Sequence, residues 1–450
     1  MSVRIFNLIL GLVLLPLMVQ AQTMVINSEM TWQGRMELSG PVQITASGVL
    51  TISAGTQVKI LDPSHNISVQ GQLFIDGTPE NPVVFDSVKA WQGISFIESR
   101  PDSHILFAQF SDCAQALGII ATSPLISNNR FTNCEAAVKL LRESNAEIID
   151  NHFVENGLGL GIEMRSSPRV AGNRFIGHKK SGISASNSSR GLLENNHFEK
   201  NEQGIGIYQP YPDKIIKNTF VENKVALYCY QTQNSIQIEE NLFLNNEYGL
   251  VNFSFSFPSI KNNRFLKNKT AIQNDQFGSA LVENNLFESN DTAIYNNRKS
   301  NPKINMNKFV GNKLGLFIDY SSYPLVRNNN FEKTVEGARL GVYQSADWEK
   351  RSGSKQLVMK NAQDRGSKNA MLGQAPTKYQ DIVDLSENWW GEKTASLNSD
   401  QNNPNSSFFY DRMDKPTVTY EGFGPDSYRL DEIRFLPVLS EPVANAGPQP

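Results

Sequence analysis

The chain has 450 residues, of which 39% are hydrophobic, and a formal net charge of −3 at pH 7. This nearly balanced charge argues against a strongly basic nucleic-acid-binding surface, so no nucleic-acid partner is expected. Beyond residue 21, no segment holds the roughly 18 consecutive apolar residues that a membrane-spanning helix needs, so no transmembrane segment is expected after signal removal.

The N-terminus has the organisation of a secretory signal peptide over residues 1–21. Arg4 precedes an apolar run from Leu8 to Val19, and Ala21 completes a small-residue cleavage sequence. Gln22 stands where a lipoprotein would need cysteine. We therefore expect an exported protein that is secreted, periplasmic or located on the cell surface.

Residues 22–107 contain short apolar segments at irregular spacing, for example at 49–52 and 83–85. They are predicted to form an N-terminal cap and the first irregular coils, because the end of a solenoid must be shielded from water and from strand pairing. Trp32 and Trp91 are assigned to packing in this cap or at a coil corner.

An Asn-x-Phe triplet recurs through residues 108–345, which are predicted to form regular repeats. Each repeat also holds apolar segments of two to four residues with strand periodicity. A fixed period of this length predicts a solenoid of one coil per repeat, and three short strands per coil make an all-β, single-stranded parallel β-helix. The phenylalanines, which are 22 or 23 residues apart, are Phe131, Phe153, Phe175, Phe198, Phe220, Phe243, Phe265, Phe287, Phe309 and Phe331.

The asparagines of the repeat are interpreted as stacked ladders, in which each amide pairs with the same amide one coil away. Asparagine also tolerates the left-handed backbone of a sharp bend. One ladder precedes each Phe, a second follows it by three residues, and Asn252, Asn274 and Asn296 are expected to form a third inside the lumen. The phenylalanines are expected to fill that lumen.

The repeat resembles that of right-handed parallel β-helix proteins of the pectate-lyase-like and NosD-like exported families. Asn-x-Phe, followed by Asn and then by Gly or Ala with Ile or Leu, carries this resemblance over residues 110–331, and segments 48–56 and 69–82 are similar to the flanks of the secreted members. The resemblance implies a right-handed helix. It leaves activity open, because this scaffold carries lyases, hydrolases, epimerases and non-enzymatic binders. NosD-like members add metalloenzyme maturation as a further alternative.

The period ends after Phe331. Residues 346–380 are interpreted as a basic loop insertion, which is either solvated or lies over a polysaccharide groove. Residues 381–440 are predicted to form the last coil and the C-terminal cap strands, since Asn388-Trp-Trp-Gly391 is similar to the closing motif of exported β-helix proteins. Residues 441–450 form a tail rich in proline, glycine and alanine.

Cys113 and Cys134 each follow a repeat position of Phe by three residues, so they are expected to stack one coil apart. A disulfide between them is one reading in an oxidising compartment, and two stacked small apolar side chains is the other. Cys229 is assigned to the core.

Alternation along one strand of each coil predicts two outward columns rich in aromatic residues. Flat rings on a sheet face stack on sugar rings, whereas the alternative is that they only stabilise the sheet or lie under the insertion. Glu163 shares one of these columns and is also a candidate substrate-binding residue. The candidate substrate-binding rings are Tyr208, Tyr228, Tyr230, Phe253, Tyr295 and Phe317. A separate outward column just before each Phe is basic, with Arg130, Arg174 and Lys308, and is read as solvated charge or as an acidic-glycan site.

Asp275 and Asp319 are the candidate catalytic acids, because two coils separate their backbones by only about 10 Å. No Arg or Lys occupies these columns nearby, which departs from a pectate-lyase-like active site. No nucleotide, zinc or calcium motif is present, so neither a cofactor nor a metal is expected. The sequence therefore favours a non-catalytic protein that binds an extended polysaccharide or a cell-surface partner, with a polysaccharide lyase or glycoside hydrolase as the alternative.

Overall fold

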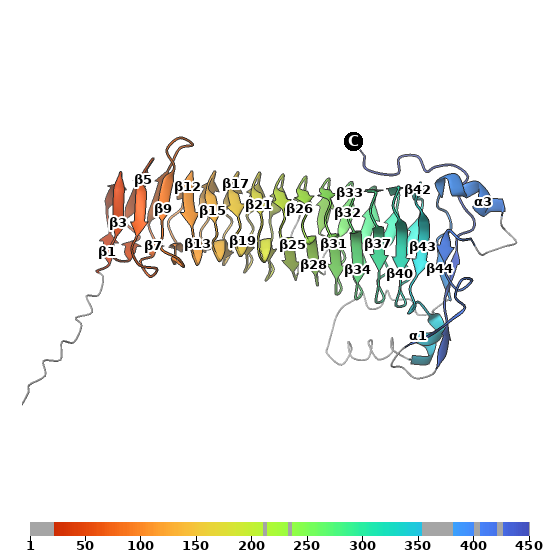
Figure 1. Cartoon of the computed structure of the whole chain (residues 1–450). Helices are drawn as coiled ribbons and strands as arrows, with labels where there is room; N and C mark the ends of the chain where they lie inside the picture. The colour runs from red at the N-terminus through yellow and green to blue at the C-terminus, as the bar shows by residue number, and fades with distance from the viewer. Residues whose placement is uncertain are drawn as a thin grey trace, which may run out of the picture.

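The computed structural model describes residues 22–209, 214–232, 236–352, 381–399, 406–420 and 426–449. These residues form a rod of stacked coils (Figure 1), and the fold is the expected right-handed parallel β-helix. Each regular coil gives one strand to each of three long parallel sheets, which hold 16, 14 and 14 strands. We name them sheets A, B and C.

Sheet A carries the longest strands of the regular coils. Its strands are β1 (Met24–Ile26), β4 (Val42–Ile44), β7 (Ile67–Val69), β10 (Ile94–Ile97), β13 (Gln115–Ile120), β16 (Ala136–Leu141), β19 (Leu158–Ile162), β22 (Ser181–Ala185), β25 (Gln203–Tyr208), β28 (Val225–Tyr230), β31 (Tyr248–Phe253), β34 (Thr270–Asp275), β37 (Thr292–Asn296), β40 (Leu314–Ile318), β43 (Glu336–Leu340) and β45 (Phe409–Tyr410).

Sheet B follows sheet A in each coil. Its strands are β2 (Glu29–Trp32), β5 (Val49–Ser53), β8 (Gln72–Asp76), β11 (His104–Leu106), β14 (Leu125–Ser127), β17 (Glu147–Ile149), β20 (Arg169–Ala171), β23 (Leu192–Glu194), β26 (Lys214–Ile216), β29 (Gln237–Glu239), β32 (Ser259–Lys261), β35 (Leu281–Glu283), β38 (Lys303–Asn305) and β41 (Leu325–Arg327).

Sheet C contains the repeat phenylalanines. Its strands are β3 (Arg35–Leu38), β6 (Gln57–Ile60), β9 (Val83–Asp86), β12 (Ala108–Ser111), β15 (Arg130–Thr132), β18 (His152–Val154), β21 (Arg174–Ile176), β24 (His197–Glu199), β27 (Thr219–Val221), β30 (Leu242–Leu244), β33 (Arg264–Leu266), β36 (Leu286–Glu288), β39 (Lys308–Val310) and β42 (Asn330–Glu332).

The repeat phenylalanines form one continuous stack inside the lumen, as the sequence predicted. From Phe85 to Phe331, neighbouring ring centroids lie 4.3–5.2 Å apart, and every ring is at most 1% exposed. Trp91 stacks on Phe85 at 5.6 Å, and Trp390 stacks on Phe331 at 4.3 Å. Tryptophans therefore close both ends of the stack. Trp32 is also buried, at 2% exposure.

The asparagine ladders are confirmed. In the first ladder, Nδ2 of Asn129 donates to Oδ1 of Asn151 at 3.0 Å, and the same bond repeats from coil to coil up to Asn388. The left-handed residue at each bend is the one before the ladder asparagine, such as Asn128 with φ of 59° and Asp150 with φ of 55°. The ladder amides therefore stabilise the bends by hydrogen bonding, whereas their neighbours adopt the left-handed backbone.

The C-terminal end of the rod is covered by short helices and strands, and it includes a helix where a loop was expected. Residues expected as the start of a loop insertion form helix α1 (Ala346–Ser352), while residues 353–380 lie outside the described residues. The indole of Trp348 packs against Tyr320 of the rod and against Tyr420, with ring centroids 5.7 Å and 5.9 Å apart, respectively. The remaining elements are β44 (Ile382–Asp384), η2 (Gly391–Lys393), α3 (Thr394–Ser399), β46 (Thr417–Thr419), β47 (Ser427–Arg429) and β48 (Glu432–Arg434).

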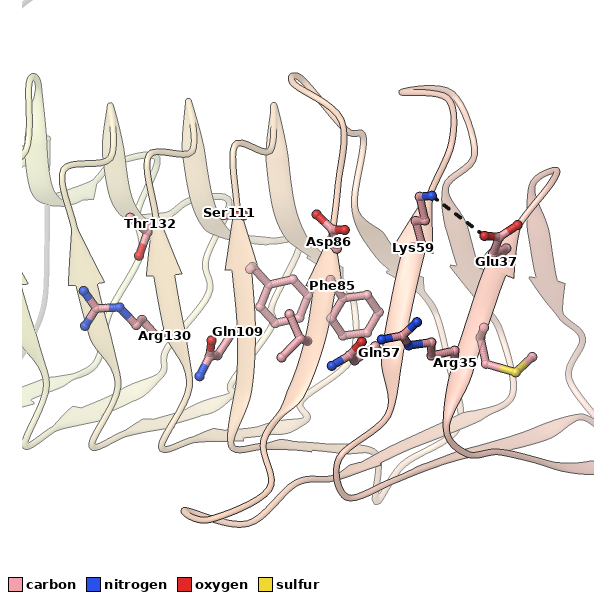
Figure 2. Close-up of a pocket in the computed structure, with 13 residues that line it drawn as sticks. Arg35, Glu37, Gln57, Lys59, Phe85, Asp86, Gln109, Ser111, Arg130 and Thr132 are labelled. Atoms are coloured by element: carbon pink, nitrogen blue, oxygen red, sulfur yellow. Dashed lines mark ion pairs between the residues drawn. The ribbon is translucent and has the colours of Figure 1, made fainter.

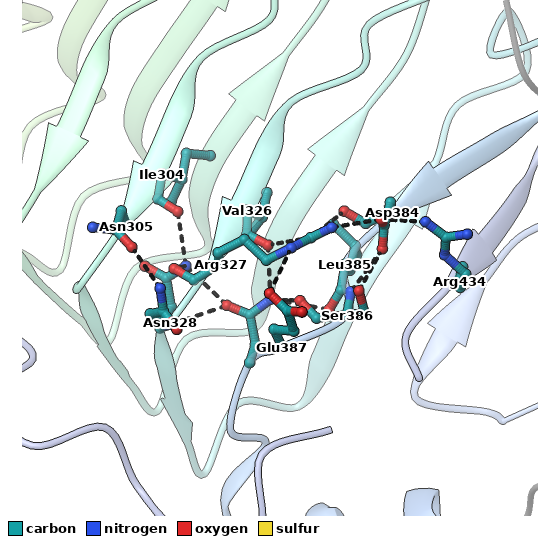
Figure 3. A network of polar contacts seen from close by, with 12 residues as sticks. Ile304, Asn305, Val326, Arg327, Asn328, Asp384, Leu385, Ser386, Glu387 and Arg434 are labelled. Carbon is teal, nitrogen blue, oxygen red and sulfur yellow. Dashed lines mark hydrogen bonds and ion pairs between the residues drawn. The ribbon is translucent and has the colours of Figure 1, made fainter. Parts of the chain in front are cut away.

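An ion-pair network ties this cap to the last coil (Figure 3). Asp384 accepts from the guanidinium groups of both Arg327 and Arg434, and Nη1 of Arg327 also donates to the backbone oxygen of Asp384 at 3.1 Å. Burial alone would raise the pKa of Asp384, but hydrogen bonds from Arg434, Ser386 and Arg327 outweigh it and hold that pKa well below its usual range. β44 pairs with β48 in a two-stranded sheet beside this network.

The C-terminal tail runs back along the outside of the rod toward β33 (Figure 1). The backbone N–H of Val443 donates to Oδ1 of Asn330 at 2.8 Å, and that of Gly447 donates to the backbone oxygen of Met306 at 2.8 Å. The backbone N–H of Gln449 reaches Oδ1 of Asn262 at 3.3 Å. The tail therefore crosses four successive coils, since the amide of Asn284 in the intervening coil also reaches the backbone oxygen of Asn445.

Candidate functional site

The six aromatic residues of the outward columns of sheet A lie where the sequence placed them. Tyr228 pairs in register with Val251, which is followed by Gln273, Tyr295 and Phe317 on the next three strands. Residues that alternate with them, such as Leu227 and Cys229, are fully buried in the lumen. We call the six rings Tyr208, Tyr228, Tyr230, Phe253, Tyr295 and Phe317 the aromatic stripe. All six are half-buried.

Four rings of the aromatic stripe form one cluster on β25, β28 and β31. Tyr208 lies 5.9 Å from Tyr228 and 6.4 Å from Tyr230, and Phe253 lies 6.0 Å from Tyr230, measured between ring centroids. The hydroxyl of Tyr208 donates to Oε1 of Gln203 at 3.1 Å. Burial raises the pKa of Tyr228 to about 12, so its hydroxyl stays protonated at neutral pH. The four rings therefore contact each other and remain partly exposed.

The other two rings form a separate pair. Tyr295 and Phe317 stack at 4.7 Å between centroids, with an angle of 10° between their planes. Along the first column, Val251 and the half-buried Gln273 lie between Tyr228 and this pair. The aromatic stripe therefore extends from β25 to β40, and β34 contributes no ring to it.

Asp275 is not a free carboxylate on this face. Nε of Arg298 donates to its Oδ1 at 2.6 Å, and the second guanidinium nitrogen binds Oδ2 in the same bidentate pair. The side chain of Asp275 is 7% exposed, whereas that of Arg298 is 46% exposed. Arg298 also lies over the ring of Phe253, with 5.5 Å from its guanidinium carbon to the ring centroid. The expectation that no cation lies near Asp275 is therefore wrong.

The sequence missed Arg298 because it lies beyond the strand, in the bend that follows β37. Its backbone is left-handed, with φ of 45°, so its side chain leaves the regular alternation and turns back over the preceding coil. In the sequence, the only indication of this cation was that an arginine follows the second column by one residue.

Asp319 lies beneath the C-terminal elements rather than on the open face. Its Oδ1 accepts the backbone N–H groups of Tyr320 and Tyr343, both at 2.8 Å, and the residue is 8% exposed. A Cβ at Gly341 would come within 2.1 Å of the Asp319 carboxyl carbon, so a glycine is needed there. Burial raises the pKa of Asp319 to about 6. The expectation that Asp319 points outward and is exposed is therefore wrong.

Glu163 is half-buried on the connection after β19, two coils from Tyr208 on the N-terminal side. It is thus outside the four-ring cluster. Strand register also keeps it five coils from Asp275, or roughly 24 Å at the usual strand spacing. The structure brings Phe253, Asp275 and Arg298 together, but it does not add Glu163 to them.

The disulfide reading of Cys113 and Cys134 is corrected, because both thiols are free and buried. They do stack one coil apart, and their Sγ atoms donate to the backbone oxygens of Ser111 and Thr132. Stacked residues of parallel strands have parallel Cα–Cβ bonds, so their Cβ atoms stay about 4.8 Å apart, beyond the 3.5–4.5 Å that a disulfide prefers. Cys229 is fully buried, as expected of a core residue.

Within the described ranges, no group of three or more His, Cys, Asp or Glu side chains could hold a metal ion. None of the helices that the structure describes is long and apolar enough to cross a membrane.

Two family models match overlapping parts of the chain. The model described as "Periplasmic copper-binding protein (NosD)" matches residues 92–254, and the one described as "Right handed beta helix region" matches residues 248–362. No curated protein matches the sequence.

Similar solved structures include a PL6 alginate lyase in complex with a trisaccharide, with 10% identity, a TM-score of 0.35, and coverage of 70% of this chain and 80% of that chain. Two variants of the periplasmic alginate epimerase AlgG are 13% and 12% identical, with TM-scores of 0.31 and 0.32. Each comparison covers 67% of this chain, and 76% and 77% of the respective epimerase chains. With its repeat, its fold and the two family matches, this chain belongs to the right-handed parallel β-helix repeat family.

Proposed function

We propose that this protein binds an extended polysaccharide, or a glycan-bearing surface partner, along the aromatic stripe of sheet A without catalysing a reaction. The supporting observation is that six half-buried rings project from neighbouring strands of one sheet face. Successive coils repeat at about 4.8 Å, so a chain of sugar rings lying along the rod meets one ring after another. A small molecule would need a closed pocket instead.

Polar groups beside the rings suit the same ligand. Gln203 and Gln273 offer amide donors and acceptors for sugar hydroxyls, and the Tyr228 hydroxyl stays protonated. Arg298 is held by Asp275 and by the face of Phe253, so its exposed edge is presented in a fixed orientation. In this proposal Asp275 positions Arg298 and does not act on the ligand.

Calorimetric titration with neutral and acidic oligosaccharides of increasing length tests the proposal. We expect affinity to grow with chain length, and Tyr228→Ala with Tyr230→Ala to weaken binding about tenfold or more, since each stacked ring contributes of order 1 kcal/mol. Phe74→Ala is the matched control, because Phe74 is an equally half-buried outward ring on β8 of sheet B. If the wild type binds nothing in a broad panel, the rings are sheet packing and the proposal is wrong.

A polysaccharide lyase or hydrolase that uses Asp275 and Asp319 is the second candidate. The raised pKa of Asp319 favours it, because a general acid must hold its proton near neutral pH. The ion pair on Asp275 and the cover over Asp319 favour binding alone. Incubation with each bound glycan, followed by an assay for new chain ends, separates the two. New ends that disappear in Asp275→Asn and Asp319→Asn, with binding retained, would establish the enzyme.

We propose an exported location for this binding. The signal-like sequence of residues 1–21 supports it, although these residues lie outside the described part of the chain. The family model that matches residues 92–254 is also described as periplasmic. Fractionation of the native host, with immunoblotting of medium, periplasm and cytoplasm, tests the location, and a purely cytoplasmic protein would contradict it.

A further inference from the structure

Sheet C carries a second line of polar side chains, on a face that the aromatic stripe does not touch. The residue before each buried phenylalanine, or its equivalent in the first coils, points outward. Strand register aligns these residues one above another. We call the exposed members the polar stripe: Arg35, Gln57, Gln109, Arg130, His152 and Arg174. Half-buried Val84 lies among them.

The N-terminal half of the polar stripe lines a groove of about 700 Å³. Figure 2 shows Arg35, Gln57, Gln109 and Arg130 in one row, on strands β3, β6, β12 and β15 of sheet C. A second row runs parallel to it and consists of Glu37, Lys59, Asp86, Ser111 and Thr132. The groove therefore offers guanidinium, amide and hydroxyl groups at regular steps, and its two acidic groups, Glu37 on β3 and Asp86 on β9, lie away from Arg130 on β15.

The arginines of the polar stripe lack the carboxylate partner that many other cations of this rod have. On other faces, a cation commonly pairs with a carboxylate one coil away, as Lys224 does with Glu202 and Lys313 with Asp291. Arg35, Arg130 and Arg174 have no such partner among the described residues, whereas Glu37 is already paired with Lys59 at 3.8 Å. No ion pair within the described structure therefore neutralises these three guanidinium groups.

The electrostatic effect is visible at His152, which lies between Arg130 and Arg174 in the register. Burial, together with the charges of Arg174 and Arg130, lowers the pKa of His152. The same positive field attracts an anion. Arg130 and Arg174 are two coils apart, about 10 Å at the usual strand spacing, with His152 between them as a neutral hydrogen-bonding group.

We propose that the outer face of sheet C from Arg35 to Arg174 is a second glycan site, which takes a linear acidic polysaccharide. Charge complementarity carries the assignment, since a guanidinium binds a carboxylate through two parallel hydrogen bonds. Arg130 and Arg174 bind carboxylate-bearing sugars two coils apart. Gln57, Gln109, Ser111 and Thr132 bind hydroxyls of the adjoining units. Glu37 and Asp86 repel carboxylates, so the acidic sugars lie at the Arg130 end.

The test is calorimetric titration of the full chain with a galacturonate hexamer, and with the neutral cellohexaose for comparison. We expect the hexamer to bind, with an affinity that falls as NaCl is raised because salt screens exposed charges. Arg130→Gln with Arg174→Gln should weaken hexamer binding at least tenfold. Cellohexaose should not compete for this face.

Arg264→Gln is the matched control, because Arg264 is exposed in the same column and also precedes a buried phenylalanine, but lies six coils from Arg130. It should change hexamer affinity less than twofold. If Arg264→Gln lowered hexamer affinity as much as the Arg130→Gln, Arg174→Gln double variant, the binding would be unspecific charge attraction and the proposal would be wrong. Unchanged hexamer binding in the double variant would also overturn it. If only Tyr228→Ala and Tyr230→Ala abolish hexamer binding, the acidic glycan belongs to sheet A instead.

Discussion

The backbone N–H of Asn156 donates to Nδ1 of His178 at 3.3 Å, at the one rung of the second ladder between residues 156 and 312 that is not asparagine. His178 continues the ladder, because its backbone N–H donates to Oδ1 of Asn201 at 2.9 Å. Its Nε2, however, is buried without a hydrogen-bond partner in the described structure. Burial lowers the pKa of His178 to about 3, so the ring is neutral in the folded rod.

His178→Asn should therefore stabilise the protein. An asparagine continues the ladder between Asn156 and Asn201 and removes the unpaired buried nitrogen, whose desolvation costs about 1–3 kcal/mol. The folded-state pKa is depressed, so the favourable effect of neutral His178 is complete above its unfolded pKa of about 6.5 and is lost toward pH 3, at up to about 1.4 kcal/mol per pH unit. The gain should thus grow on acidification.

Urea unfolding of the wild type and the variant at pH 7 and pH 5 measures this gain. His152→Asn is the control, because His152 is exposed on the outer face of β18 and should change the free energy of unfolding by less than about 0.5 kcal/mol. A difference between variant and wild type that is independent of pH would contradict a buried neutral imidazole.

Asp431 should have the opposite pH dependence. Its carboxylate accepts from the backbone N–H of Ala346 and the hydroxyl of Tyr323, both at 2.8 Å, yet burial raises its pKa to about 6. A raised folded-state pKa means that protonation favours folding, so this group adds stability as the pH falls from about 6 toward 4. We expect Asp431→Asn to remove that gain. Thermal unfolding of the variant and the wild type across this pH range checks this expectation. If the unfolding temperatures of the two proteins changed with pH in parallel, the expectation would be wrong.

The regular coils could be derived from the sequence because their determinants are local. Each Asn-x-Phe triplet sets a bend, an inward ring and an outward neighbour within three residues, so register errors cannot accumulate from coil to coil. The aromatic stripe followed from the same register. In contrast, the bends after sheet A vary in length, and a residue in such a bend, such as Arg298, is not placed by the period.

The surroundings of Asp319 could not be derived, because they depend on residues far along the chain. Tyr343 and Gly341 follow the last regular coil, and α1 packs Trp348 against Tyr320. A basic composition at 346–380 gave no sign that its first residues form a helix with a buried Glu349, which pairs with Lys299 at 2.9 Å. Burial by a distant segment is a tertiary effect that strand alternation does not contain.

Phe243→Ala should destabilise the rod by about 3–5 kcal/mol, as large-to-small changes in a packed core do. Phe243 is 0% exposed and stacks on Phe220 at 4.8 Å and on Phe265 at 4.5 Å. Leu242→Ala on the same strand is the control, because Leu242 points outward and is only half-buried. Denaturant melts in which the two variants lose equal stability would contradict the lumen stack.

Asn274→Leu should lower the free energy of unfolding by more than the loss of the hydrogen bonds of one side chain would suggest. Asn274 accepts from Nδ2 of Asn252 at 3.1 Å and donates to Oδ1 of Asn296 at 3.0 Å, and all three residues are fully buried. Oδ1 of Asn252 and Nδ2 of Asn296 already lack partners within the described structure. The single change therefore leaves both neighbours with unpaired amides, at about 1–3 kcal/mol for each stranded group.

Replacing Asn252, Asn274 and Asn296 together by leucine should cost less than replacing Asn274 alone. The triple change removes every partner at once, and the equivalent positions in the two flanking coils, Cys229 and Ile318, are already apolar and fully buried. Such non-additivity is the signature of residues that act as one hydrogen-bonded unit. Urea unfolding of the single and triple variants measures it. A triple variant that loses about three times as much stability as the single one would show that the three amides act independently, because nothing would then be stranded by removing the middle one.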